Sequence, residues 1–335
     1  MSSAALFVAR APGSAAPEAA PADPEVQLAN RGEAFGALGP FVSEQGVSDV
    51  FVNPDGTVWL DRGSGAEAAT GVRIPRGEAR ELAVRLIALG GRHVDESTPC
   101  VDVRVGAGAR VHVVLPPVST GGAAISIRLQ RERPISFDDL VADSFFSVVA
   151  AEQVRQLVAR RANLLITGAG GSGKTTLMGA LLATAPRHER IVVLEDVAEL
   201  QIAHPHVVAL ESRQANLDGA GALGLDRLVR EALRMRPDRL VVGECRGAEV
   251  RELLAALNTG HDGGAGTLHA NSLADVPARL EALGMLAGLQ PEALARQAVS
   301  AFDAVLHVER TSSGRRLAAL GGLQLDRRGR LAVAA

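Results

Sequence analysis

The sequence predicts an α/β fold, in which a larger domain with a parallel sheet follows a smaller α+β domain. Residues 147–322 alternate short apolar runs with helical patterns, as a parallel sheet with crossover helices requires. Residues 36–133 instead place several strand patterns around one helical pattern. A chain of 335 residues is long enough to form two domains with separate cores.

The first part of the chain contains a tail and the smaller domain. Residues 1–35 are rich in Ala, Pro, Ser and Gly, which bury too little apolar surface to fold alone, so we expect a disordered tail with a short helix near 26–35. Residues 134–146 are expected to link the domains. The strands and the helix predicted in the smaller domain cover residues 49–52, 57–60, 78–89, 101–105, 110–115 and 124–129.

The second domain is predicted from its alternating order of elements. We expect strands at 164–166, 191–194, 240–243 and 266–268. We expect helices at 177–182, 225–235, 248–257 and 273–283, with residues 323–335 as a C-terminal tail. In such sheets ligands bind at the carboxyl ends of the strands.

Residues 163–176, NLLITGAGGSGKTT, carry the clearest chemical signal. A buried strand pattern, a turn that matches G-x-x-x-x-G-K-[ST] and a helical pattern form the context that a phosphate-binding loop needs. Glycines let backbone N–H groups converge on phosphate oxygens, and the helix start adds the positive end of its dipole. We expect a nucleoside-triphosphate site, with ATP and Mg²⁺ as ligands. Its residues would be Gly168, Gly170, Gly171, Ser172, Gly173, Lys174, Thr175 and Thr176.

The use of lysine supports this site. Lys174 is the only lysine among 35 basic residues, and all the others are arginine. A compact ammonium has thus been kept at the position where the loop needs one. We expect Lys174 between the β- and γ-phosphates and the Thr175 hydroxyl on Mg²⁺.

Three polar positions further along the chain could complete the chemistry of phosphate transfer, which needs Mg²⁺, a positioned water and cations. Glu195 ends a strand and could hold Mg²⁺ through water, although the acidic residues there could also open an ordinary helix. Glu244 ends the apolar strand of RLVVGE, as in a Walker B element. His269 follows a short strand and could reach the γ-phosphate, or make only local hydrogen bonds.

Composition narrows the possible partners and the location. A net charge of −3 gives no electrostatic case for nucleic acid as the main partner. Cys100 and Cys245 lie far apart, so neither a zinc site nor a disulfide framework is indicated. No apolar run is long enough for a membrane span, and the N-terminus does not resemble a signal peptide. We therefore expect a cytoplasmic protein that reaches a membrane only peripherally, through a partner.

Four ordered motifs, TGAGGSGKTTL, LEDVAEL, RMRPDRLVVGECRGAE and NTGHDGGAGTLHANS, resemble the type II/type IV secretion ATPase superfamily. The nearest likeness is to the CpaF-like ATPases of Tad (Flp pilus) assembly systems. VSDVFVNPDG, RHVDESTPCVDVRV and ISIRLQ extend the resemblance into the first domain. The four-cysteine metal module of type II secretion and type IVa pilus extension ATPases is absent from the sequence, which argues against those branches.

The resemblance implies a RecA-like second domain and a homo-hexameric, Mg²⁺-dependent ATPase motor that acts on an inner-membrane platform protein. It implies that Glu195 and Glu199 belong to the Asp box, that Glu244 is the Walker B glutamate and that His269 belongs to the His box. It also implies that Arg110 and Arg128 of the first domain approach the phosphates.

Three alternatives remain open. The same motor could serve a conjugation-type (type IV) secretion system, which genomic neighbours would distinguish from a pilus system. A P-loop kinase would need an acceptor, so phosphate release without one would exclude it. A nucleic-acid motor would be stimulated by nucleic acid.

Overall fold

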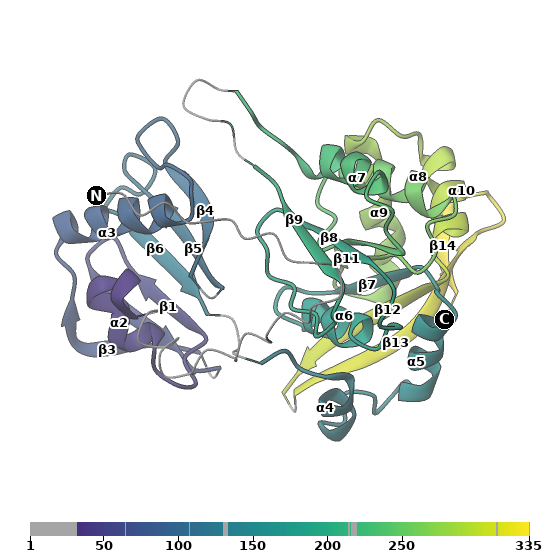
Figure 1. Cartoon of the computed structure of the whole chain (residues 1–335), viewed down its shortest axis with the longest axis horizontal. Helices are drawn as coiled ribbons and strands as arrows, with labels where there is room; N and C mark the ends of the chain where they lie inside the picture. The colour runs from purple at the N-terminus through teal and green to yellow at the C-terminus, as the bar shows by residue number, and fades with distance from the viewer. Residues whose placement is uncertain are drawn as a thin grey trace, which may run out of the picture.

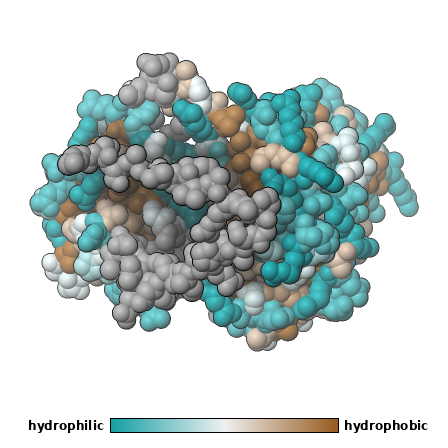
Figure 2. Space-filling model, viewed as in Figure 1, coloured by the Kyte–Doolittle hydropathy of each residue, from teal (hydrophilic) through white to brown (hydrophobic). Residues whose placement is uncertain are grey.

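The computed structural model describes residues 32–334 except 64, 107, 130–132, 214, 216–219 and 313. Most of the expected N-terminal tail therefore lies outside the described residues. Figure 1 shows two lobes: the purple-to-blue lobe is the first domain, and the teal-to-yellow lobe is the second. Where it is coloured, the surface in Figure 2 is mainly hydrophilic, with apolar residues in small patches.

The first domain is an antiparallel sheet covered by helices. Its strands are β1 (Asp49–Val52), β2 (Thr57–Asp61), β3 (Ala66–Arg73), β4 (Cys100–Val105), β5 (Ala109–Val114) and β6 (Ala124–Arg128), in the order β3-β2-β1-β6-β5-β4. Its helical segments are η1 (Gly36–Leu38), α2 (Gly39–Val42) and α3 (Arg76–Leu89).

Alternation along these strands separates a core face from a polar face. In β5, Val111 and Val113 are fully buried, whereas Arg110 and His112 point to the other side. Helix α3 packs its apolar side on the core face through Leu82 and other buried residues. Phe35 is also fully buried in this core, although it falls within the expected tail. The polar face is left free for other contacts.

The second domain has a mainly parallel sheet. Its strands are β7 (Leu164–Gly168), β8 (Ile191–Glu195), β9 (Val207–Glu211), β10 (Arg239–Val242), β11 (Ala265–His269), β12 (Ala304–Thr311), β13 (Gly314–Leu325) and β14 (Leu331–Ala334). Their order is β14-β13-β12-β7-β11-β10-β8-β9, and only the pairs β12–β13 and β13–β14 are antiparallel among the strands described.

Helices cover both faces of this sheet, so nearly all residues of its central strands are buried, and most of them are apolar. The helical segments are α4 (Phe137–Ala142), α5 (Ala151–Ala159), α6 (Lys174–Leu182), α7 (Leu225–Leu233), α8 (Glu249–Leu257), η2 (Leu273–Asp275), α9 (Val276–Leu286) and α10 (Pro291–Ala301). In β7, Leu165 packs in the core under α7–α10, and its neighbours Leu164 and Ile166 pack in the core under α4–α6. This double burial explains a continuous apolar run in place of an alternating one.

Two segments differ from their expected roles. Residues 134–146 include helix α4, whose Phe137 is buried in the core beneath α6. Residues 323–335 include the end of β13 and all of β14, and Leu323 and Leu331 are buried there. Within the described residues, no helix combines the length and the apolar character needed to cross a membrane.

Candidate functional site

The glycine-rich loop joins the end of β7 to the start of α6. Gly168 and Gly173 adopt φ angles of 152° and 106°. A Cβ at Gly168 would lie 2.3 Å from the carbonyl oxygen of Val308 and 2.6 Å from Ser172 Oγ. Only glycine therefore fits at the entry of the loop, which lets the backbone pass close to β12.

The ammonium of Lys174 is turned onto its own loop. Its Nζ donates to the carbonyl oxygens of Gly168 at 3.0 Å and Ala169 at 2.9 Å. The residue is only 7% exposed, and burial lowers the pKa of its ammonium, against the opposing effect of Glu244. Ser172 Oγ is buried and has no hydrogen-bond partner among the residues described. An anion with several oxygens would satisfy both groups.

Glu195 lies at the carboxyl end of β8, which β11 and β10 separate from β7 and its loop. Its carboxylate accepts backbone N–H groups of Glu199 and Leu200 at 3.1–3.2 Å. Burial raises the pKa of Glu195 to about 7, although these N–H groups and Arg104 oppose the change. A cation bound beside this buried carboxyl would favour its ionised form, as a magnesium ligand requires.

Glu244 follows β10 and is paired on two sides. Its Oε2 accepts from Arg246 at 2.5 Å, and its Oε1 lies 2.6 Å from His269 Nε2, although without hydrogen-bond geometry. Burial lowers the pKa of His269, and the nearby cations reinforce this, whereas Glu244 opposes it. The imidazole is therefore mainly neutral at pH 7 and can exchange its contact with Glu244 for another partner.

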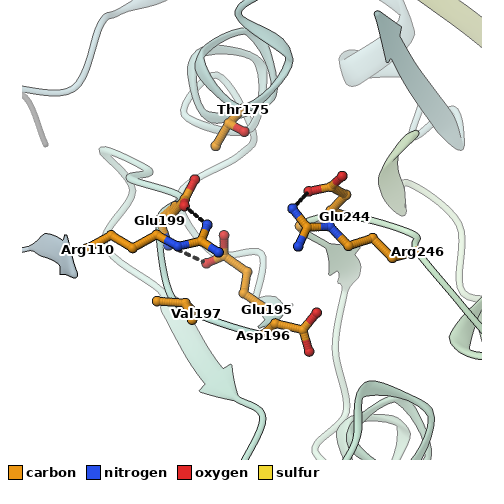
Figure 3. A pocket seen from close by; sticks show the side chains of 9 residues that line it. Arg110, Thr175, Glu195, Asp196, Val197, Glu199, Glu244 and Arg246 are labelled. Atoms are coloured by element: carbon orange, nitrogen blue, oxygen red, sulfur yellow. Dashed lines mark hydrogen bonds and ion pairs between the residues drawn. The ribbon is translucent and has the colours of Figure 1, made fainter. Parts of the chain in front are cut away.

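Arg110 of the first domain reaches this region from β5. Its guanidinium bonds to Glu199 and donates from Nε to Asp102 Oδ1 at 3.3 Å. In Figure 3 it extends from the left toward Glu199, and Thr175 lies above on its helix. The charged side chains of both domains thus meet at the carboxyl edge of the parallel sheet.

These groups line one pocket (Figure 3). Its lining is Arg110, Thr175, Glu195, Asp196, Val197, Glu199, Gly243, Glu244 and Arg246. A hydroxyl and several carboxylates are hard oxygen donors of the kind that Mg²⁺ takes, and the loop beside them offers an ammonium and a buried hydroxyl to phosphate. The residues present therefore fit ATP with Mg²⁺.

The structure brings together most of the site residues expected from the sequence, but it does not bring Arg128 to the pocket. Arg128 pairs with Asp49 at 3.0 Å, and its side chain is 66% exposed. Its proposed contact with phosphate stays a prediction.

Two further arginines near the site were not expected. Arg246 pairs with Glu244, and Arg315 of β13 donates from Nε to the carbonyl oxygen of Gly171 at 3.1 Å. Sequence offers a signal only for Arg246, which lies two residues after Glu244, the expected Walker B glutamate.

Comparison with known proteins relates this site to a family. The family model described as "Type II/IV secretion system protein" matches residues 33–311. The "Putative conjugal transfer protein Rv3659c" of Mycobacterium tuberculosis is 46% identical over 287 residues, covering 84% of this chain and 82% of the relative. The "Conjugal transfer protein TrbB" of Rhizobium radiobacter is 34% identical over 277 residues, covering 81% and 82%.

A solved structure shares the fold. The Legionella pneumophila ATPase DotB matches with a TM-score of 0.62 and 19% identity, covering 89% of this chain and 82% of that one. At this identity the likeness supports the arrangement of the two domains and nothing finer.

Proposed function

Because the chain belongs to the type II/IV secretion system protein family, we propose that it is a Mg²⁺-dependent ATPase motor of a conjugal-transfer or other type IV secretion machinery. The observation that carries the proposal is the pocket in which Thr175 of the phosphate loop faces Glu195, Glu244 and Arg110. A phosphate loop, strand-end carboxylates and a cation from a second domain are the parts that phosphoryl transfer to water requires.

Each residue has a task that follows from its contacts. Bound ATP supplies the phosphoryl group, and Mg²⁺ offsets part of its charge. Lys174 leaves the loop carbonyls for phosphate oxygens, since its Nζ already lies at the loop mouth. The Thr175 hydroxyl and the Glu195 carboxylate would hold the metal. Glu244 orients the attacking water and accepts its proton at a carboxylate oxygen.

His269 and Arg110 are the remaining pocket groups with a proposed role, His269 at Glu244 and Arg110 at the transferring phosphoryl group. His269 Nε2 lies against Glu244 and would sense whether that carboxylate is engaged with water. Arg110 must exchange Glu199 for the transferring phosphoryl group, and this exchange replaces a contact between the domains. The energy of ATP is thereby linked to the contacts between the domains.

The quaternary state and the partner remain parts of the proposal. We propose a homo-hexamer that docks peripherally on an inner-membrane platform protein. The relatives named as conjugal transfer proteins support this setting. The resemblance of RHVDESTPCVDVRV and its neighbouring motifs to CpaF-like ATPases supports Tad pilus assembly as a second candidate.

Two experiments test the proposal. Steady-state phosphate release from Mg-ATP by the purified chain, with Lys174→Ala as the inactive control, tests the activity. No release above that control refutes the ATPase. Deletion of the gene then separates the candidates: loss of DNA transfer or protein secretion supports type IV secretion, whereas loss of surface pili alone supports the Tad system.

A further inference from the structure

Arg92 is a partly buried arginine that joins the two domains. It lies just after α3 in the first domain, and its side chain is only 13% exposed. Its Nη1 donates to the carbonyl oxygen of Asp102 in β4 at 2.9 Å. Its Nη2 donates to the carbonyl oxygens of Ser212 at 3.0 Å and Asp196 at 3.4 Å in the second domain. One guanidinium thus binds the backbones of both domains.

Both anchor points carry groups of the proposed active site. The carboxylate of Asp102 accepts from Arg110, while its carbonyl oxygen accepts from Arg92. Asp196 directly follows Glu195 at the pocket edge. Arg92 therefore links the residue that orients the catalytic cation to the loop that starts at the expected metal ligand.

The loop after Glu195, to which Arg92 binds, is also held by hydrogen bonds within the second domain. The backbone N–H of Ala198 donates to Glu211 Oε2 at 3.3 Å, and Glu211 Oε1 lies 3.5 Å from Arg92 Nη2. The hydroxyl of Ser212 donates to the carbonyl oxygen of Asp196 at 3.1 Å. These bonds hold the backbone of the second domain in place where Arg92 binds it. The contact can therefore fix the distance between this loop and the first domain.

We propose that Arg92 is a positioning residue that fixes the first domain against the loop after Glu195 and so sets the reach of Arg110 into the pocket. The inference rests on the proposed ATPase function. A planar guanidinium suits the role, since its separate nitrogens serve the two domains at once, which an ammonium on a flexible stem does not. Its acceptors are mostly backbone carbonyls, which no change of protonation removes.

A double-mutant cycle tests the proposal. Phosphate release and binding of a fluorescent ATP analogue are measured for wild type, Arg92→Ala, Arg92→Lys, Arg110→Ala and the double variant Arg92→Ala/Arg110→Ala. Arg80→Ala is the matched control, because Arg80 lies on α3, is exposed and pairs only loosely with Glu96 at 3.9 Å.

We expect Arg92→Ala to lower kcat by about 10–100-fold, the range that a misplacement near 1 Å can cause. Its KM and analogue binding stay close to wild type, since the phosphate loop is untouched. The kcat of Arg92→Lys should fall as far as that of Arg92→Ala. The kcat of the double variant should equal that of Arg110→Ala alone. Arg80→Ala keeps full turnover.

Two results would overturn the proposal. If the losses from Arg92→Ala and Arg110→Ala multiply in the double variant, Arg92 does not act through Arg110. If Arg92→Lys turns over ATP as fast as wild type, a guanidinium that binds both domains is not needed. Arg92→Lys also carries the test if the alanine variant does not fold.

Hydrogen exchange separates failure of this inference from failure of the ATPase proposal. In the wild-type chain, amides 196–200 should exchange slowly, and Arg92→Ala should speed their exchange while Arg80→Ala does not. If wild type releases no phosphate, the ATPase proposal fails. The hydrogen exchange of the variants then still shows whether Arg92 holds the loop at 196–200. Unchanged exchange in Arg92→Ala would refute that contact.

Discussion

The buried carboxyl of Glu195 should make the stability of the second domain depend on pH, and Glu195→Gln tests this. Burial raises the pKa of Glu195 from its ordinary 4.5 to about 7, and the residue is only 7% exposed. One pKa unit corresponds to about 1.4 kcal/mol, so holding this group ionised costs the fold about 3 kcal/mol. The cost is large against a typical net stability of about 5–15 kcal/mol.

The direction of the effect follows from where the proton binds more tightly. Below pH 4.5 the carboxyl is protonated in both the folded and the unfolded chain, so it costs nothing. As pH rises from 4.5 through 7, the unfolded chain releases the proton first, and the fold loses stability. Gln keeps the shape of the protonated acid and has no proton to lose. Glu195→Gln should therefore match wild type near pH 4.5 and exceed it by about 3 kcal/mol at pH 8.

Thermal unfolding between pH 5 and pH 8 measures this difference. For a domain of this size, about 3 kcal/mol corresponds to a rise in Tm of roughly 6–12 °C at pH 8. Glu292→Gln serves as a control, since this glutamate is exposed at the start of α10, and it should change stability by no more than about 0.5 kcal/mol. If Glu195→Gln raises Tm by the same amount at every pH, the stability difference does not come from ionisation of Glu195, and the reasoning is refuted.

The remaining predictions concern the other pocket residues. Lys174→Ala should abolish phosphate release, and Lys174→Arg should also fail, because a planar guanidinium does not fit a loop closed around a single ammonium; near-normal turnover of the arginine variant would disprove the assignment. Glu244→Gln should bind nucleotide normally, as judged by a fluorescent analogue, and lose about 10²-fold or more in kcat, whereas loss of binding would point to a structural role. Arg110→Ala should lower kcat by about 10³-fold with nucleotide binding intact, and Arg128→Ala should cost much less, because Arg128 pairs with Asp49 outside the pocket; equal losses would show that both reach the phosphates.

The parts of the site that were predictable from sequence follow from the parallel sheet. Glu195, Glu244 and His269 each end or follow an apolar run, and neighbouring parallel strands end at one edge of a sheet. Their position near the phosphate loop could therefore be predicted without knowing any side-chain contact. The loop itself was predictable because backbone geometry requires its glycines and phosphate binding requires the compact ammonium of its lysine.

The contacts between the domains were not predictable in the same way. Arg92 and its acceptors in the second domain are more than 100 residues apart, and an arginine after a helix looks like any surface residue. Strands β13 and β14 were missed for a different reason. Glycines interrupt the run LAALGGLQL, so local pattern favours a tail, yet tertiary packing buries Leu323 and Leu331.

The two arginines that cross the domain boundary differ in what holds them, and the difference bears on how the motor would work. Arg110 is held by the side chains of Glu199 and Asp102, so a phosphate that carries more charge can take it over. Arg92 is held mainly by backbone carbonyls, which offer no such exchange while the loop keeps its shape. On the proposed mechanism, Arg92 would therefore be the fixed point between the domains, and Arg110 the contact that ATP exchanges. A motion driven by ATP would then be a rotation of the first domain about the contacts of Arg92, since complete separation would break bonds that nucleotide cannot replace.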